Sequence, residues 1–314
     1  MIKKSSICLI VVYFGKLPNY FQLWLNSCRY NSTINFLLFI DDKTCYDVPQ
    51  NVKIIYSNLI SIKDMAKQKF DFDISLEYSY KLCDYKPVYG LIFEEYLKDY
   101  DYWGYCDIDT IFGNLRKFLD EDIIKQYDKI YSAGHFTIYK NDYKNKNAFK
   151  YVKDENGEFL YEKVFSTNSS FYFDEFYGIF KLYGVDENYS MYAKLDVIAD
   201  ISHRYVDLYP IDQLHHSNQV FEWSCKNEKC NLFGYYMFDG NIQKKEYMYI
   251  HLQKRNMKVS SVNSNKFYIV ANEFKNLDGI NKKLFKKMKM IRISYVKYKV
   301  KRFCQRKFGK GVKI

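Results

Sequence analysis

The stretch Tyr102-Trp-Gly-Tyr-Cys-Asp-Ile-Asp-Thr-Ile-Phe-Gly113 places two carboxylates, Asp107 and Asp109, directly after an aromatic and apolar run of the strand-forming kind. Residues i and i+2 of an extended segment project to the same side. The two acids can therefore converge on one divalent cation, and carboxylate oxygens suit Mg²⁺ or Mn²⁺. The sequence thus predicts a metal site at the end of a strand.

The Asp-x-Asp pattern alone does not identify this site, because it recurs at Asp71/Asp73, Asp99/Asp101 and Asp120/Asp122. Those copies lie in charged, turn-like or helical surroundings, which favour solvated surface acids. Only the copy at 107 and 109 follows a strand-like run. We therefore interpret that copy alone as a ligand pair.

The segments around this motif alternate between strand and helix patterns. Residues 81–97 have apolar positions at helical spacing, with Pro87 in the first turn. Near the start of the chain, Ser6 to Phe14 is a continuous apolar run that ends at Gly15, as in a strand buried in a parallel sheet. A helix over 17–28 and strands over 35–40 and 52–56 complete a pattern of βαβ units. In such open α/β sheets, ligands bind beyond the carboxyl ends of the strands.

The first apolar run is about nine residues long and lacks a small-residue cleavage site, so we interpret it as a strand and not as a signal peptide. No apolar stretch reaches the roughly 18 residues needed to span a bilayer. The eight cysteines are scattered, and several fall within expected strands or helices. We expect reduced, buried thiols and a cytoplasmic location.

Four blocks of the sequence resemble, in order, those of a largely uncharacterised family of bacterial proteins assigned as glycosyltransferases and usually found with surface-polysaccharide genes. The likeness covers about residues 6–260, and the blocks are Asp84–Pro87, Trp103–Leu115, Ala133–Asn141 and Ile250–Arg255. The resemblance implies an α/β fold of the GT-A type, with a Rossmann-type mixed sheet flanked by helices. It also implies metal-dependent transfer of a sugar from a nucleotide-sugar donor, a UDP-sugar in our interpretation, to a glycan or lipid-linked acceptor.

The same resemblance implies a donor site at the strand ends. Its residues are Tyr13, Phe14, Gly15, Asp42, Asp84, Lys86, Asp107 and Lys254. Lys86 at a helix start can approach the diphosphate, since a first turn favours anions. For Asp42 and its neighbour Asp41, a role as turn-forming acids is an equal alternative to nucleotide binding, and for Asp84 the alternative is a helix cap.

A third metal ligand is expected from His251, with Lys254 and Arg255 following it, because related transferases supply a late histidine and a nearby lysine. Together with Asp107 and Asp109 it forms a mixed oxygen and nitrogen set that suits Mn²⁺ at least as well as Mg²⁺. The alternative is a structural histidine.

A catalytic carboxylate is expected from Asp174 or Glu175 in Phe171–Gly178, where an aromatic setting can raise the pKa of a base. Helix capping by the pair is the alternative, and Asp212 is a weaker candidate. Gly134 and His135 are expected beside the acceptor. The sequence does not choose between retention and inversion.

We expect one domain over 1–278, with 142–215 as an acceptor lobe and 142–157 as a mobile loop, followed by a tail over 279–314. The tail holds fourteen of the 48 Lys and Arg residues and none of the 37 Asp and Glu residues. Apolar residues recur in the tail at helical spacing, which predicts a basic amphipathic helix. We expect this helix to bind the anionic lipids of the inner face of the membrane. A solvated helix and nucleic-acid binding are the alternatives for the tail, nucleic acid being less favoured. A non-catalytic carbohydrate-binding or scaffold protein of the same fold is the alternative for the whole chain.

Overall fold

A computed structural model of the chain describes residues 4–175, 178–203, 205, 207–211 and 218–287. The chain forms two compact units, each built from three stretches of sequence. Unit 1 comprises Met1–Pro18, Asn31–Ile108 and Arg116–Leu195, and unit 2 comprises Asn19–Tyr30, Asp109–Leu115 and Asp196–Ile314.

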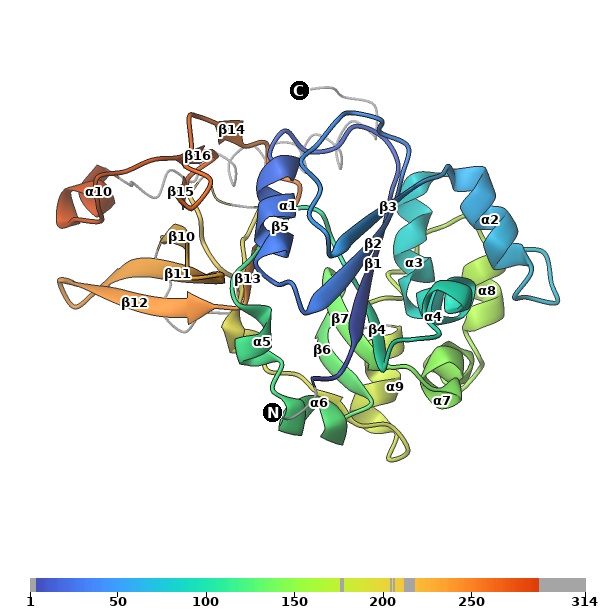
Figure 1. The fold of residues 1–314 in the computed structure, drawn as a ribbon. Coiled ribbons are helices and arrows are strands. Elements are labelled where there is room, and N and C mark those ends of the chain that lie inside the picture. Colours follow the sequence, from blue (N-terminus) through green and yellow to red (C-terminus); the bar gives the residue numbers. More distant parts are fainter. Residues whose placement is uncertain (1–3, 176–177, 204, 206, 212–217, 288–314) are drawn as a thin grey trace, which may run out of the picture. The chain divides into compact units, whose positions relative to one another are not determined.

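Unit 1 is organised around a seven-stranded sheet in the order β3-β2-β1-β4-β7-β6-β8 (Figure 1). The first four strands in this order are parallel, β4 and β6 each pair antiparallel with β7, and β8 runs parallel to β6. The mixed α/β character expected from the sequence is therefore confirmed. The strands are β1 (Ile7–Tyr13), β2 (Ile34–Ile40), β3 (Val52–Tyr56), β4 (Tyr102–Cys106), β6 (Lys129–Ala133), β7 (Phe136–Lys140) and β8 (Met191–Tyr192).

The helices of unit 1 are short, and several gather on one face of this sheet (Figure 1). Apolar side chains of α2, α3, α4 and α8 form one buried core with the residues of β1, β2, β4 and β7 that point to that face. The α-helices are α2 (Leu59–Lys67), α3 (Leu82–Tyr85), α4 (Tyr89–Ile92), α6 (Glu121–Gln126), α7 (Tyr143–Asn147), α8 (Tyr161–Ser166) and α9 (Ile179–Val185), and α5 (Leu115–Phe118) starts at the last residue of a unit 2 stretch. The 3-10 turns are η1 (Ser79–Lys81), η2 (Lys86–Val88), η3 (Glu94–Tyr96) and η4 (Ala148–Tyr151).

Two expectations for unit 1 are wrong in detail. The helix predicted over 81–97 is a chain of short pieces, η1 to η3 with α3 and α4, because Pro87 has no N–H to donate in the middle of the segment. The loop predicted over 142–157 begins with α7 and η4. Asp142 caps α7 by accepting the N–H of Asn145, whose buried side chain accepts a hydrogen bond from the Tyr183 hydroxyl.

The described residues of unit 2 form two sheets with the α-helices α1 and α10. A six-stranded sheet has the order β12-β11-β10-β15-β16-β14, and a three-stranded sheet has the order β5-β13-β9. The elements are α1 (Phe21–Arg29), β5 (Thr110–Phe112), η5 (Leu195–Val197), β9 (Ile198–Asp200), β10 (Val220–Lys226), β11 (Lys229–Phe238), β12 (Asn241–Tyr247), β13 (Tyr249–His251), β14 (Lys258–Val259), β15 (Lys266–Val270), β16 (Glu273–Lys275) and α10 (Lys282–Lys287). Strand β13, which ends at His251, is only three residues long, because the chain turns at Gln253 and Lys254, both with positive φ.

The predicted basic tail is described only as far as Lys287, and its residues from 288 onward lie outside the described part of the chain. Leu284 and Phe285 of α10 pack against Val220, Tyr268 and Val270. The start of the tail is therefore partly buried against the core of unit 2. Among the described residues, no helix has the length and hydropathy needed to cross a bilayer.

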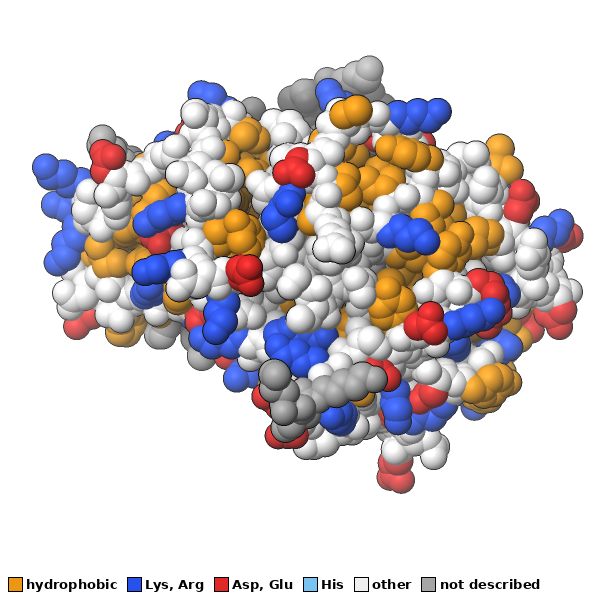
Figure 2. Space-filling view, in the orientation of Figure 1, with side chains coloured by type: hydrophobic (Ala, Val, Ile, Leu, Met, Phe, Trp, Pro, Cys, Tyr) orange, Lys and Arg blue, Asp and Glu red, His pale blue; other side chains and the backbone are white. Residues whose placement is uncertain are grey.

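The surface of unit 1 combines both signs of charge with some apolar area. Figure 2 shows hydrophobic side chains gathered over β3 and the helices beside it, between scattered Lys, Arg, Asp and Glu residues. Tyr56 at the end of β3 and Ile60 of α2 are 57% and 71% exposed. The seven cysteines in the described part of the chain are free thiols.

Candidate functional site

The end of β4 carries Asp107 out of the core of unit 1. All five residues of β4 are buried, and Gly104 at its centre allows β7 to approach so closely that a Cβ would lie 2.2 Å from the Thr137 carbonyl oxygen. Asp107 then leaves the sheet with its N–H donated to the His135 carbonyl at 3.0 Å. Its side chain is partly exposed, at 31%. The Asp107 carboxylate therefore lies just beyond the carboxyl end of β4, the position that the sequence predicts.

Lys86 joins Asp107 to a second carboxylate. Its buried ammonium lies 2.8 Å from Oδ1 of Asp107 and 3.4 Å from Oδ2 of Asp174, and it donates to the Gly134 carbonyl at 2.7 Å. Burial lowers the pKa of Lys86, but the charges of Asp107 and Asp174 outweigh that effect and hold the pKa well above its usual value. Lys86 is therefore a fixed cation between two acids.

Asp174 is a buried carboxyl, whereas its neighbour Glu175 is exposed. Burial raises the pKa of Asp174 to about 7; Lys86 opposes this rise, and the charges of Glu175 and Asp107 add to it. A carboxyl with a pKa near neutrality can take up and release a proton at physiological pH. Of the two candidate catalytic acids, Asp174 has the environment of a general base.

The segment that carries Asp174 is held in place by Asp84. The carboxylate of Asp84 is fully buried, accepts the N–H groups of Phe171 and Phe173, and lies 2.9 Å from the Lys81 ammonium. Asp84 was expected from the sequence among the donor-binding residues or as a helix cap. In the structure its oxygens serve to position the 171–173 segment.

Gly134 and His135 lie in the turn between β6 and β7. A register shift between Ile130 and Ala133 and the left-handed conformation of Tyr131, with φ of 62°, mark a bulge just before this turn. A Cβ on Gly134 would lie 2.9 Å from Oδ2 of Asp174. The bulge and the glycine therefore bring the backbone of this turn next to the side chains of Asp174 and Glu175.

The residues expected to bind the nucleotide lie at the carboxyl ends of β1 and β2, on the same side of the sheet as Asp107. Tyr13 is the last residue of β1 and pairs with Ile40 of β2, so Phe14, Gly15, Asp41 and Asp42 follow the same edge as Asp107. Asp41 accepts the Gly15 N–H at 2.8 Å. Asp42 accepts the N–H of Thr44, and hydrogen bonds from Thr44 lower its pKa. Both acids thus stabilise turns at the edge where a ligand would bind.

Unit 2 brings together Asp109, His251 and a third residue, Asp200. Asp109 precedes β5, while His251 and Asp200 are the last residues of β13 and β9 and pair with each other in register. Nε2 of His251 lies 3.4 Å from Asp109, and Nδ1 lies 2.7 Å from Asp200. Burial by itself lowers the pKa of His251. The carboxylates of Asp109 and Asp200 raise it by more than burial lowers it, so the resulting pKa is about 10.

The turn after His251 supports this cluster. Lys254, in a left-handed conformation, donates its N–H to Oδ2 of Asp109 at 2.6 Å, and its side chain is exposed. The side chain of Gln253 donates to Asp200 at 2.8 Å. Arg255 donates to the carbonyls of Ser202 and Tyr205, which fix its guanidinium group.

Sequence reasoning missed Asp200. Its signal was the apolar run Val197-Ile-Ala that ends in this acid, the same pattern of a strand followed by an acid that singled out Asp107. Asp212, the weaker catalytic candidate, lies outside the described residues, as do His215 and His216.

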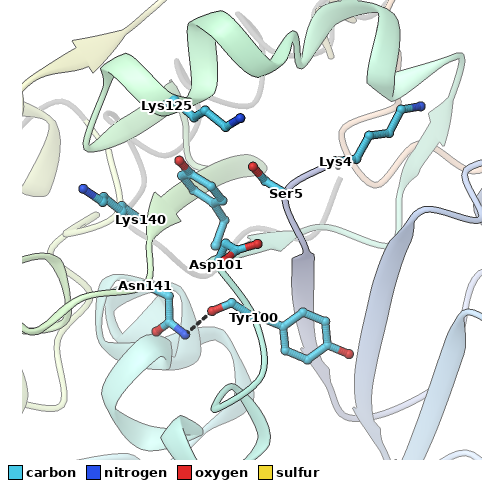
Figure 3. Close-up of a pocket in the computed structure, with 8 residues that line it drawn as sticks. Lys4, Ser5, Tyr100, Asp101, Lys125, Lys140 and Asn141 are labelled. Carbon is cyan, nitrogen blue, oxygen red and sulfur yellow. Dashed lines mark hydrogen bonds between the residues drawn. The ribbon is translucent and has the colours of Figure 1, made fainter. Parts of the chain in front are cut away.

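A hollow of about 480 Å³ lies at the other end of the strands of the unit 1 sheet, where β1 and β4 begin (Figure 3). It is lined by Lys4, Ser5, Tyr100, Asp101, Tyr102, Lys125, Lys140 and Asn141. Its one carboxylate, Asp101, accepts the N–H and hydroxyl of Ser6. None of the site residues predicted from the sequence lines this hollow.

Comparison with known proteins gives a family match and similarity to solved structures. The model of a family of unknown function, DUF6625, matches residues 9–278. No curated protein sequence matches the chain. Among solved structures, the crystal structure of galactosyltransferase LgtC in complex with donor and acceptor sugar analogues is similar over 62% of this chain and 75% of that chain, with 13% identity and a TM-score of 0.34. At that TM-score, the similarity adds nothing to the assignment of an activity.

Proposed function

The chain belongs to the DUF6625 family, and we propose that it is a metal-dependent glycosyltransferase that moves a sugar from a nucleotide-sugar donor, a UDP-sugar, to a lipid-linked or surface-polysaccharide acceptor. One observation carries this proposal. Each carboxylate of Asp107-Ile-Asp109 meets a cluster of chemically active groups in its own unit, Lys86 with Asp174 in unit 1 and His251 with Asp200 in unit 2.

Asp109 and His251 are suitable ligands for Mn²⁺ or Mg²⁺, and Asp107 would complete the set. Only Ile108 separates Asp107 from Asp109, so their Cα atoms are within about 7 Å of each other along the chain. The Asp200 carboxylate beside Nδ1 of His251 leaves Nε2 as the ligand atom, the usual arrangement of a carboxylate, a histidine and a metal. A cation bound there would neutralise the leaving diphosphate as a Lewis acid.

Lys86 and Asp174 supply the remaining chemistry. Lys86 presents a permanent positive charge at the sheet edge, where it would bind a diphosphate oxygen. Asp174 would accept the proton of the acceptor hydroxyl if the reaction inverts the sugar carbon, and Glu175 is the exposed alternative. Gly134 and His135 would line the acceptor side, and the ends of β1 and β2 would hold the nucleotide. The protein would work on the inner face of a membrane, with its basic tail on the anionic lipids.

The test is a screen of nucleotide sugars for Mn²⁺-dependent hydrolysis by the full chain. We expect one donor to be hydrolysed, with the rate lowered at least about a hundredfold in Asp107→Asn, because removal of a charged transition-state contact costs that much. Asp71→Asn is the matched control, since Asp71 is an exposed acid in another Asp-x-Asp pair. Metal and donor binding without turnover would favour a carbohydrate-binding or scaffold protein. Salt-sensitive binding of nucleic acid, with no donor binding, would favour the third alternative.

A further inference from the structure

Two cysteines face each other across the hairpin of β10 and β11 in unit 2. Cys225 of β10 and Cys230 of β11 are directly opposite residues in the antiparallel register. Asn227 and Glu228, both with positive φ, form the two-residue turn that joins the strands, as the twist of a tight hairpin requires. In the registers of the described strands, no other position pairs two cysteines. The hairpin therefore fixes these thiols as cross-strand neighbours.

The backbone hydrogen bonds show which kind of cross-strand pair this is. Cys225 donates its N–H to the carbonyl of Asn265 at 2.8 Å, and Asn265 precedes β15, the strand on the other side of β10. The N–H of Cys225 thus points away from β11, so the pair is of the non-hydrogen-bonded type, in which the Cα atoms are about 4.5 Å apart and the side chains are closest. A disulfide needs Cα atoms about 4.4–6.8 Å apart. The hairpin therefore already has the backbone spacing of a disulfide.

Both sulfur atoms lie on the same face of the sheet, since opposite residues of an antiparallel pair share a face. The Cys225 thiol donates to Oδ1 of Asn265 at 3.5 Å, and the Tyr30 hydroxyl donates to the same oxygen at 3.2 Å. A hydrogen bond with Cys225 is the main cause that raises the pKa of Tyr30 to about 12, and the charges of Cys225 and Cys230 also raise it. The two sulfur atoms are therefore near one tyrosine hydroxyl.

The two thiols differ in their access to solvent. Cys225 is partly exposed, whereas Cys230 is fully buried and its thiol donates to the Gly113 carbonyl at 3.1 Å. An oxidant in solution therefore meets Cys225 first, and Cys230 is placed to attack the modified Cys225 from inside the protein. A disulfide sulfur has no proton, so oxidation would remove the hydrogen bond to Gly113. A thiol is a weak donor, so this loss opposes oxidation only slightly.

We propose that Cys225 and Cys230 are a redox modification site, which reacts with small disulfides of the glutathione type and closes reversibly into a cross-strand disulfide. In the first step the Cys225 thiolate attacks one sulfur of glutathione disulfide, the S–S bond breaks, and one glutathione thiolate leaves. In the second step the Cys230 thiolate attacks Sγ of Cys225, the mixed disulfide breaks, and the second glutathione thiolate leaves. The protons of the two cysteines pass to the two released glutathiones. Two electrons thus move from the thiol pair to glutathione disulfide, and no step depends on sugar transfer.

The first experiment maps the disulfide after the full chain has been incubated with glutathione disulfide and its remaining thiols have been blocked. Trypsin cleaves after Lys226 and Lys229, so the two cysteines fall in separate peptides, 205–226 and 230–244. We expect mass spectrometry to find these peptides linked, at least about tenfold more abundantly than peptides that link any other two cysteines. Dithiothreitol should separate them. Glutathione on Cys225 without linkage, or preferred linkage of either residue to a third cysteine, would overturn the proposal.

The second experiment separates the folded geometry of the pair from its closeness in sequence. The ratio of disulfide to dithiol is measured at one fixed composition of reduced and oxidised glutathione, in buffer and in concentrated urea. We expect the ratio to be at least about tenfold higher in the folded protein, because the hairpin holds the thiols together and the cross-link restricts the unfolded chain. A ratio in buffer no higher than in urea would overturn the proposal, since the folded hairpin would then not favour the disulfide.

Three serine variants test the order of the two steps. Cys230→Ser keeps a donor for the Gly113 carbonyl and should hold glutathione on Cys225 as a stable mixed disulfide. Cys225→Ser should leave Cys230 as a thiol under the same treatment, because Cys230 is buried. Cys45→Ser removes an exposed thiol elsewhere and is the matched control, in which the linked peptides should form as in the unmodified protein. Glutathione on Cys230 in Cys225→Ser would overturn the assignment of Cys225 as the first thiol to react.

Discussion

Nδ1 of His251 lies 2.7 Å from Oδ1 of Asp200, and the two residues are the paired ends of adjacent parallel strands. The strands fix both backbones, so the carboxylate sets the orientation of the imidazole ring. Gln253 donates to the same carboxylate oxygen and restricts it in turn. Nε2 is left for Asp109 and, in the metal site that we propose, for a cation, so the proposed role of Asp200 is to orient the histidine.

Asp200→Asn should weaken Mn²⁺ binding by roughly 10- to 100-fold, because loss of the carboxylate that orients a ligating histidine has effects of that size. Calorimetric titration with Mn²⁺ measures it. Asp196→Asn, an exposed acid just before β9, is the matched control and should bind Mn²⁺ as the unmodified protein does. Equal affinity in Asp200→Asn would show that His251 is not a ligand.

Asp109→Asn should abolish Mn²⁺-dependent binding of a UDP-sugar while the fold remains cooperative. The amide keeps an oxygen that can accept the Lys254 N–H, but it removes the negative charge beside His251. Calorimetry of donor binding with and without Mn²⁺, together with a urea melt of the same preparation, separates the two effects. Donor affinity equal to that of the unmodified protein would remove Asp109 from the site.

Asp174 should make unfolding depend on pH in the direction opposite to that of most acids. Its pKa is raised from 3.8 to about 7 on folding, so between these values the folded state holds a proton that the unfolded state has released. The contribution to stability is therefore full below about pH 4 and is lost as the pH rises to 7, by up to about 4 kcal/mol. Urea unfolding from pH 4 to 7 should show this slope, and Asp174→Asn should flatten it. The same slope in the variant would assign it to another group.

Much of unit 1 could be predicted because its sequence signals are local. Continuous apolar runs ended by Gly15 or by Asp107 mark buried strands and their ends, and the observed bounds of β1, β2 and β3 fall within a residue of the predicted ones. Pro87 is a local signal for the break in the predicted helix over 81–97, but the placement of the short pieces depends on tertiary contacts such as that of Asp84 with Phe171, which the sequence does not show.

The sequence predicted some members of each cluster of site residues but not which of them are in contact. Asp107, Lys86 and Asp174 come from three distant segments, and their residue types suggested chemistry without showing which groups touch. Asp200 carried only the short signal of an apolar run that ends in an acid, and its place beside His251 comes from the strand pairing of β9 with β13. Pairing and burial of this kind are properties of the folded chain.

Gly104→Ala should destabilise the protein by about 3 kcal/mol. The added Cβ would lie 2.2 Å from the Thr137 carbonyl oxygen on β7, and a buried backbone in a central strand cannot move away without loss of pairing. Urea unfolding measures the loss. Gly184→Ala is the control: Gly184 lies in α9 with nothing within 4 Å of its added Cβ, so alanine should stabilise by about 0.5–1 kcal/mol. A Gly104→Ala protein as stable as the unmodified one would contradict the close packing of β4 on β7.

Deletion of residues 288–314 should release the protein from anionic vesicles while leaving its melting temperature and its turnover of a soluble acceptor nearly unchanged. The deletion removes ten Lys and Arg residues, and every candidate site residue precedes it. Salt should weaken vesicle binding by the full chain, because exposed charges are screened over about 8 Å at physiological ionic strength.

Deletion from Gly279 onward should in addition lower the melting temperature, since it removes Leu284 and Phe285 from their packing against Val220 and Tyr268. Vesicle sedimentation of the three proteins decides the matter, and equal binding by the full chain and the 288–314 deletion would refute a membrane role for the tail.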